Sequence, residues 1–280
     1  MTGKAQAAVE PVGTVEMFLG LKLHAVTLPQ VSSHILSSIA ERERFTVTYL
    51  NPNYVVAARK SPELVTAINE FDLVLADGIG VVVGARALDI PVNERLSTDR
   101  VCLEVFRKCT EEKLPVRIFL LGGRPGVGEK AAEKLKATFP QLSVAGVHHG
   151  WFDPRLDARI VEMINASRPD LLLVCMGTPR QQFWVRAHAP ALKCPVIMTG
   201  GGYLDNLSVS ATYYPRWVDR AALNWLWRLC TEPRHVWKRY TIEAAVFSGL
   251  ILKQLARPRR PALQRDRPGK SGPGPKASLE

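Results

Sequence analysis

Six short apolar runs recur along the chain, with longer segments of helical pattern between them. The runs span 45–50, 72–76, 116–121, 142–147, 171–176 and 196–199. The intervening segments predict helices at 63–71, 101–113, 126–139, 156–167 and 180–187. Strands that alternate with helices of about ten to fifteen residues are typical of βαβ units, in which helices cover both faces of a mostly parallel sheet. The sequence therefore predicts an α/β fold, with a Rossmann-like parallel sheet flanked by helices over residues 14–207.

Small and polar residues follow most of these runs, at the positions where the predicted strands end. The candidates are Asn51, then Asp77 and Gly78, then Gly122, Gly123 and Arg124, then Gly177, Pro179 and Gln181, and finally Gly201. Ligands of such sheets bind outside the carboxyl ends of the strands, so we expect these residues to gather at one rim. Turns between strands and helices need the same residue types, which is the alternative interpretation of each loop taken alone.

The loop at Gly122 and Gly123 is a candidate anion site. A strand that runs into two glycines and then into a helix turns backbone N–H groups and the positive end of the helix dipole toward the loop. The loop has neither the G-x-G-x-x-G pattern nor the lysine of a P-loop, so kinases and P-loop nucleotidases are disfavoured. The sequence predicts that Gly122, Gly123 and Arg124 contact a phosphate group.

Asp77 is the candidate general base. Its carboxylate ends a buried apolar run, and Gly78 beside it would let a substrate approach the backbone closely. The alternative is that Asp77 caps the helix that follows. Arg95 either brings a positive charge to the same rim or is a surface arginine. The chain contains no Asp-x-Asp pair and no metal-ligand spacing, so a leaving diphosphate would need protein cations in place of a metal.

The C-terminal quarter carries most of the positive charge. Residues 213–280 hold 14 Lys and Arg against 5 Asp and Glu, and so supply +9 of the net charge of +11. Four of the six tryptophans and the apolar stretch 244–252 lie in the same region. The stretch is too short to span a bilayer, whereas apolar residues with tryptophans and terminal arginines favour a helix that lies in the headgroup region.

This pattern predicts a helical, basic appendage at 208–256 that docks on an anionic membrane surface. The alternative is that its helices pack on their own domain or on a second copy in a homo-oligomer. The region is too apolar for nucleic-acid binding, so no nucleic acid is expected as a partner. We expect a flexible N-terminus at 1–13 and a disordered basic tail at 257–280. The chain has no signal-peptide pattern, and we expect it in the cytoplasm.

Taken together, several segments resemble the WecG/TagA/CpsF family of bacterial glycosyltransferases, glycosyltransferase family 26. The matching pieces are the segment around Asn51, ADGIGVV from residue 76, ERLSTD around Arg95, FLLGGRPGV from residue 119, VAGVHHGWF from residue 144, VCMGTPRQQFW from residue 174, TGGGYLD from residue 199 and NWLWRLCTEPRHVWKRY from residue 224. They occur in family order over residues 45–240.

The resemblance implies an inverting, metal-independent glycosyltransferase without a cofactor. It would move a sugar from a UDP-sugar to a polyprenyl-diphosphate-linked acceptor, as a peripheral protein on the cytoplasmic face of the bacterial inner membrane. Such proteins build surface polysaccharides, including exopolysaccharides. The rival hypotheses are a non-catalytic UDP-sugar-binding or scaffold subunit, and a nucleotide-sugar enzyme such as an epimerase.

The resemblance also implies roles for single residues. Asp77 would be the base, Asn51 and Arg95 would lie in its pocket, and Gln181 matches a family glutamine. Three arginines of the appendage, Arg228, Arg234 and Arg239, would close over the pocket and meet the diphosphate. Tyr203 of the TGGGYLD segment would also bind the substrate. The chain departs from the family pattern at Gln182 and Asn224, where glutamates are usual, and at Tyr49, where threonine is usual.

Overall fold

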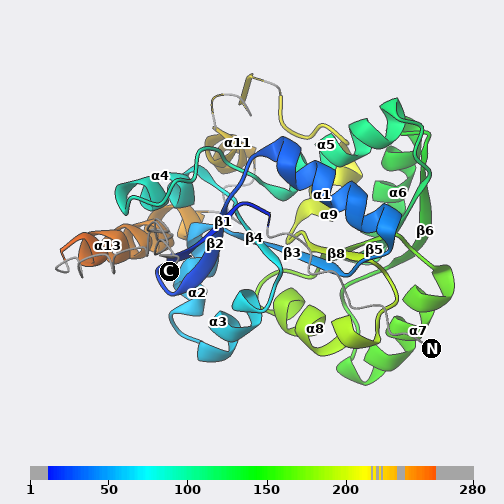
Figure 1. Cartoon of the computed structure of the whole chain (residues 1–280), viewed down its shortest axis with the longest axis horizontal. Helices are drawn as coiled ribbons and strands as arrows, with labels where there is room; N and C mark the ends of the chain where they lie inside the picture. The colour runs from blue at the N-terminus through cyan, green and yellow to red at the C-terminus, as the bar shows by residue number, and fades with distance from the viewer. Residues whose placement is uncertain (1–11, 216, 219–220, 222, 232–236, 257–280) are drawn as a thin grey trace, which may run out of the picture.

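The computed structural model describes residues 12–215, 217–218, 221, 223–231 and 237–256. Six parallel strands form its central sheet (Figure 1). They are β3 (Phe45–Leu50), β4 (Leu73–Ala76), β5 (Val116–Gly122), β6 (Leu142–His148), β7 (Leu171–Cys175) and β8 (Val196–Thr199), in the spatial order β4-β3-β8-β7-β5-β6. The predicted parallel sheet and all six of its strands are confirmed.

Helices cover both faces of this sheet, as predicted. One face carries α1 (Leu28–Glu41), α5 (Thr98–Glu111), α6 (Val127–Thr138) and α9 (Tyr203–Val209). The other carries α2 (Pro52–Ala58), α3 (Pro62–Asn69), α4 (Ile79–Ala87), α7 (Asp157–Ser167) and α8 (Arg180–His188), with short 3-10 turns at Pro154–Leu156 and Ala189–Ala191. Successive strand residues alternate between two apolar cores, because neighbouring side chains of a strand point to opposite faces. The strands β3, β4, β7 and β8 are thus buried on both sides, whereas the edge strand β6 is only partly buried.

Some elements were not predicted from the sequence. An antiparallel hairpin of β1 (Thr14–Phe18) and β2 (Leu21–Ala25) precedes the sheet. Helices α1, α2 and α9 were also missed, and α4 was raised only in the alternative in which Asp77 caps the helix that follows. The start of α2 is explained locally, because Pro52 occupies the first helical turn and Asn51 caps it through its side chain. This cap turns the chain sharply at the end of β3 and leaves Asn51 at the rim.

Beyond the sheet domain, the described part of the chain includes α11 (Asn224–Thr231), the π-helical turn η3 (Arg239–Glu243) and α13 (Ala244–Leu255). In Figure 1, α13 lies at the left end of the molecule beside α4, far from β6. One face of α13 is buried through Phe247 and Ile251, and the Phe247 ring lies 6.2 Å from that of Phe18. Gly84 of α4 allows this approach, because a Cβ atom there would lie 2.9 Å from Ile251 Cδ1.

The rest of α13 exposes further apolar side chains. Val246, Leu252 and Leu255 are exposed, and so is Ile242 in η3. Packing on its own domain, the alternative raised by the sequence, therefore holds for one face of α13 only. Within the part of the chain that the structure describes, no helix is both long enough and apolar enough to span a membrane.

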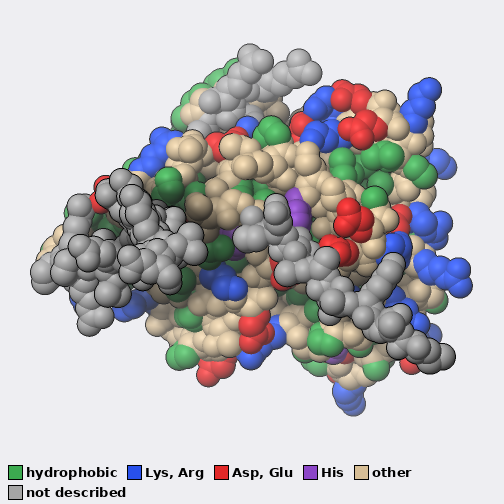
Figure 2. All heavy atoms as spheres, in the orientation of Figure 1, with side chains coloured by type: hydrophobic (Ala, Val, Ile, Leu, Met, Phe, Trp, Pro, Cys, Tyr) green, Lys and Arg blue, Asp and Glu red, His purple; other side chains and the backbone are tan. Residues whose placement is uncertain are grey.

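The sheet domain does not share the strongly basic character of residues 213–280. On the face shown in Figure 2, acidic and basic side chains are interspersed, which fits the small net charge of the chain before residue 213.

Residues 1–11 and 257–280 lie outside the described residues, so the flexible N-terminus and the disordered tail stay predictions.

Candidate active site

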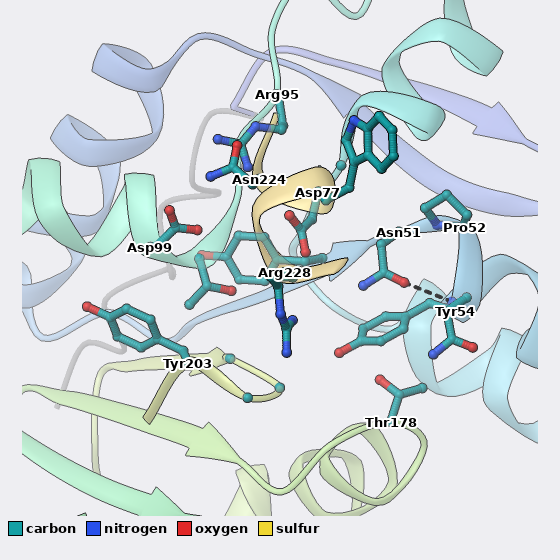
Figure 3. Close-up of a pocket in the computed structure, with 18 of the residues that line it drawn as sticks. Asn51, Pro52, Tyr54, Asp77, Arg95, Asp99, Thr178, Tyr203, Asn224 and Arg228 are labelled. Atoms are coloured by element: carbon teal, nitrogen blue, oxygen red, sulfur yellow. Dashed lines mark hydrogen bonds between the residues drawn. The ribbon is translucent and has the colours of Figure 1, made fainter. Parts of the chain in front are cut away.

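A cavity of about 470 Å³ opens at the carboxyl ends of β3, β4, β7 and β8, with residues of α11 closing part of it (Figure 3). Nine of the predicted site residues line this cavity: Asn51, Asp77, Gly78, Arg95, Gly177, Gln181, Gly201, Tyr203 and Arg228. These residues come from six separate segments of the chain. Four of the segments meet at one rim because parallel strands bring their carboxyl ends to the same edge.

Asn51 and Asp77 lie next to each other for backbone reasons. The Asp77 amide N–H donates to the Leu50 carbonyl at 2.7 Å, which extends the pairing of β4 with β3 by one residue. The Asn51 side-chain oxygen accepts the Tyr54 N–H at 3.1 Å as the cap of α2. Because the oxygen is used by the cap, the amide nitrogen of Asn51 turns toward the centre of the cavity (Figure 3). Asn51 therefore serves a structural role and presents a hydrogen-bond donor at once.

Asp77 does not occupy the N-cap position of α4. That position is Gly78, whose φ of 96° lies in the left-handed region that favours glycine. The Asp77 carboxylate instead points into the cavity (Figure 3). A carboxylate at this place can accept a proton from a bound hydroxyl group, which is the geometry that a general base requires.

Two arginines reach the cavity from different elements. The loop with Arg95 is tied to the sheet by the Leu96 N–H, which donates to the Ala76 carbonyl at 2.8 Å, and Arg100 donates to the Arg95 carbonyl. The Arg95 side chain is buried, which excludes the alternative of a surface arginine. Arg228 extends into the cavity from α11, and Asn224 of the same helix lies beside Arg95 (Figure 3). Both guanidinium groups can bind phosphate oxygens.

Gln181 ties three parts of the cavity together. Its side-chain oxygen accepts the Gly201 N–H at 2.9 Å, and its amide nitrogen donates to the Tyr54 hydroxyl at 3.3 Å. These bonds connect α8, the loop after β8 and α2. The neighbouring Gln182 is fully buried behind the cavity and does not line it, so this departure from the family pattern makes no contact with the space where a substrate would bind.

Four predicted site residues do not line the cavity: Gly122, Gly123, Arg124 and Pro179. The two glycines meet a packing requirement instead. A Cβ atom on Gly122 would lie 2.2 Å from the Cys175 carbonyl oxygen, and the Gly123 N–H donates to the same oxygen at 3.1 Å. The alternative interpretation of this loop, a turn that needs glycine, therefore has a physical basis, and phosphate binding by the loop stays a prediction.

Two more predictions fall beyond what the structure describes. Arg234 lies outside the described residues, and so does the side chain of Arg239, whose backbone belongs to η3. Their contact with a diphosphate stays a prediction. Among the described residues, no three His, Cys, Asp or Glu side chains form a group that could hold a metal ion.

Sequence reasoning missed several residues that line the cavity, including Tyr54, Thr98, Asp99, Asn206, Tyr214 and Trp225. Asp99 lies in the first turn of α5, two residues before the helix start that the sequence predicts. Tyr49 lies two residues before Asn51 on β3, a spacing that puts both on one face of the strand. Burial, with the charge of Asp77 contributing, raises the pKa of Tyr49 well above its usual range, so the phenol remains protonated.

The chain is similar to known proteins over most of its length. The model of the family described as "Glycosyl transferase WecG/TagA/CpsF family" matches residues 16–261. A protein of Staphylococcus aureus is 29% identical over 226 residues, which is 79% of this chain and 85% of that protein. A protein of Bacillus subtilis is 27% identical over 222 residues, with 76% and 84% covered. Both are named N-acetylglucosaminyldiphosphoundecaprenol N-acetyl-beta-D-mannosaminyltransferase.

Proposed function

The chain belongs to the WecG/TagA/CpsF family of glycosyl transferases, and on that premise we propose that it transfers a sugar from a UDP-sugar to an acceptor linked to a polyprenyl diphosphate. One observation carries the proposal: the Asp77 carboxylate points into a cavity that Arg95 and Arg228 also line. A base and two cations in one cavity suit a reaction in which a hydroxyl loses a proton and a diphosphate leaves.

The reaction would proceed by a single displacement. Asp77 accepts the proton of an acceptor hydroxyl while that oxygen attacks the anomeric carbon of the donor sugar. The bond between the anomeric carbon and the diphosphate oxygen breaks, and UDP departs with the negative charge. Because attack and departure occur on opposite sides of the carbon, the configuration inverts. Arg95 and Arg228 would stabilise the leaving charge in place of a metal ion, and Asn51 would orient a reacting hydroxyl through its amide N–H.

The names of the relatives support the choice of acceptor. The proteins of Staphylococcus aureus and Bacillus subtilis are named for an acceptor that joins N-acetylglucosamine to undecaprenol through a diphosphate. The cavity lining includes Ile79 and Trp225, two apolar side chains that are exposed to solvent and so mark its mouth, and also Ala244. An apolar mouth beside cationic side chains suits a diphosphate that carries a prenyl chain.

The exposed face of α13 would bring this mouth to a membrane. Its apolar side chains lie close to Ala244 in sequence, and the C-terminal quarter of the chain supplies the positive charge that anionic headgroups attract. We place the protein on the cytoplasmic face of a bacterial inner membrane as a peripheral protein. A homo-oligomer that covers the same apolar face is the competing arrangement.

The test is a transfer assay without added metal. UDP release is measured from a panel of UDP-sugars in the presence of undecaprenyl-diphosphate-N-acetylglucosamine, for the natural chain and for Asp77→Asn. We expect acceptor-dependent release from one donor and a fall in kcat of about a hundredfold or more in the variant, with UDP affinity retained. Asp153→Asn is the matched control, since Asp153 pairs with Arg155 on an exposed loop.

Two results would contradict the proposal. Turnover by Asp77→Asn at the natural rate would remove Asp77 from the chemistry. UDP binding without any transfer from any donor would favour the rival hypothesis of a non-catalytic binding or scaffold subunit, and turnover of a UDP-sugar without the lipid acceptor would favour an epimerase-like enzyme.

A further inference from the structure

Helix α4 exposes two apolar side chains beside the candidate active site. Ile79 is 38% exposed and Val83 is 57% exposed. Because they are four positions apart, the two residues lie one turn apart on the same side of the helix. Charged or polar residues are typical of the exposed side of a surface helix, but the segment IGVVVGA from residue 79 carries none. We call the surface formed by Ile79 and Val83 the α4 stripe.

The other sides of α4 are covered by the protein itself. Val81 and Val82 are buried in the apolar core. A Cβ atom on Gly80 would lie 2.9 Å from Pro52 Cγ, so α2 packs closely on α4 at this point, and α13 packs on it at Gly84. The α4 stripe is thus the side of these first turns that remains open to solvent, and the packing of the domain does not require its side chains to be apolar.

The α4 stripe begins at the cavity and continues outside it. Ile79 lines the cavity and follows Asp77 by two residues, because α4 starts directly after the loop that carries the proposed base. Trp225 of α11 lines the same cavity and is 40% exposed, so a second apolar side chain lies at the opening. Val83 does not line the cavity and lies about 6 Å further along the helix axis. The stripe therefore leads from the mouth of the cavity onto the surface.

The charges in the cavity and the apolar stripe outside it together select the ligand. Arg95 and Arg228 line the cavity and suit a diphosphate (Figure 3). A sugar nucleotide has no hydrocarbon chain to place on the α4 stripe, whereas a prenyl diphosphate has both parts, and burial of its chain on apolar side chains is favourable. A bilayer or a second copy of the chain could also cover exposed apolar residues, but neither requires the stripe to begin within the cavity.

We propose that the α4 stripe binds the isoprene units of the acceptor that are nearest to its diphosphate. The inference rests on the proposed function, since it takes the acceptor to be linked to a polyprenyl diphosphate. It assigns a role to Val83, which lies outside the cavity, and it separates acceptor binding by α4 from membrane docking by α13. The protein then holds the part of the acceptor closest to the reaction, while the rest of the prenyl chain stays in the bilayer.

The test compares Val83→Ser with the natural chain by titration calorimetry. The probes are farnesyl diphosphate, which has a prenyl chain and a diphosphate, inorganic pyrophosphate, which has the diphosphate alone, and UDP. We expect the variant to bind farnesyl diphosphate about three- to tenfold more weakly, because a hydroxyl group replaces apolar surface on the stripe. Its affinities for pyrophosphate and UDP should stay unchanged. The double variant Ile79→Ser with Val83→Ser should lose more affinity for farnesyl diphosphate than the single variant.

Val15→Ser is the matched control. Val15 is 47% exposed on β1 and does not line the cavity. The same substitution there should leave all three affinities unchanged, and the Tm should change little in either single variant because both valines are exposed. Vesicle co-sedimentation and analytical ultracentrifugation are applied to the same proteins. Val83→Ser should bind vesicles of phosphatidylglycerol and phosphatidylethanolamine as well as the natural chain does, and should keep its oligomeric state.

The inference would be overturned by unchanged affinity for farnesyl diphosphate in both the single and the double variant, by an equal loss for pyrophosphate, or by an equal loss in Val15→Ser. Weaker vesicle binding by Val83→Ser would assign the stripe to the bilayer instead, and a change of oligomeric state would assign it to a second copy. Binding does not require turnover, so the stripe can pass this test even if the natural chain transfers no sugar, in which case the proposed transfer alone fails. If the natural chain transfers sugar but binds farnesyl diphosphate no more tightly than pyrophosphate, the stripe alone fails.

Discussion

The sheet domain and the C-terminal helices are both rich in apolar side chains, but they use them differently. Every residue of β3, β4, β7 and β8 is buried. In α13 only Phe247 and Ile251 are buried, while Val246, Leu252 and Leu255 are exposed. The apolar residues of the sheet thus stabilise the fold itself, whereas those of α13 leave a surface that the described chain does not cover.

The cavity joins the two regions, and its two sides are held by different forces. Asp77 is fixed by a backbone hydrogen bond of the sheet, and Asn51 by the side-chain cap that it makes for α2. Arg228 and Asn224 come from α11, which is a short helix beyond the sheet. The floor is therefore a product of the fold, and the cover depends on how the C-terminal helices pack. Three predictions test this division.

The largest effect is expected inside the sheet domain, from Gly122→Ala. Gly122 has a φ of 145°, and a Cβ atom there would lie 2.2 Å from the Cys175 carbonyl oxygen. Backbone strain and the steric clash should together lower the free energy of unfolding by about 2–5 kcal/mol. Urea unfolding followed by circular dichroism measures this loss.

Gly126→Ala is the control for the strain alone, since Gly126 also has a positive φ of 84° but no atom within 4 Å of its added Cβ. It should lose only about 1 kcal/mol. Equal losses in the two variants would mean that the close contact between the β5 loop and β7 contributes nothing.

An intermediate effect is expected at the C-terminal helices, from the double variant Ile242→Glu with Leu252→Glu. Both side chains are exposed, at 56% and 66%, so the free energy of unfolding should change little. Binding to vesicles of phosphatidylglycerol and phosphatidylethanolamine should fall about tenfold or more, because two apolar contacts are replaced by charges that the anionic surface repels. Co-sedimentation with the vesicles measures the change.

The control carries the same substitutions on exposed apolar residues of the sheet domain, Leu156→Glu with Val209→Glu. It should bind vesicles nearly as well as the natural chain. If the control loses as much binding as the α13 variant, the difference between the two regions does not explain membrane binding. If an α13 variant instead becomes monomeric from a dimer, a second copy covers this face.

The smallest effect concerns the pH dependence of stability, which should reside in the sheet domain. His24 of β2 is buried, and its Nδ1 accepts the Val74 N–H of β4 at 3.1 Å. Burial lowers the pKa of His24 in the folded state below the value of 6.5 that an exposed histidine has. The unfolded chain therefore binds more protons than the folded chain as the pH falls below about 6.5, and stability is lost in that direction.

His24→Asn retains an acceptor oxygen near the Nδ1 position but cannot titrate. Between pH 7 and about pH 5.5 the natural chain should lose about 1 kcal/mol more stability than this variant. Chemical unfolding at both pH values measures the difference. Parallel curves for the two proteins would show that another group causes the acid sensitivity.

The sequence predicted those site residues whose position follows from the strands alone. Asn51, Asp77 and Gly201 each come shortly after an apolar run, and parallel strands bring such positions to one edge. Tyr49 was noted only as a departure from a family pattern, because it lies inside an apolar run and polarity there is not visible from periodicity. Gly122 was predicted to bind a ligand, but its contact with Cys175 joins residues distant in the chain, which local sequence patterns do not show.

The C-terminal helices were foreseen as a region but not in detail. Arg228 was predicted to reach the cavity through the family resemblance alone. Trp225 and Asn224 also reach it, and no strand order dictates where their short helix lies. The hairpin of β1 and β2 was missed because its residues precede the first apolar run and carry mixed polarity.

The strand order has a consequence for how the protein is made. The last strand in sequence, β8, lies in the middle of the sheet, where it pairs with β3 on one side and with β7 on the other. Among the described strands, no other strand joins these two. While the ribosome is still synthesising the chain, β3 with β4 and β5 with β6 and β7 can form only as two separate sheets, each with an exposed edge. The two become one sheet when residues 196–199 emerge and insert between them. The cavity, which needs loops from both halves, can therefore assemble only after most of the chain has left the ribosome, so a shorter nascent chain cannot contain the complete site.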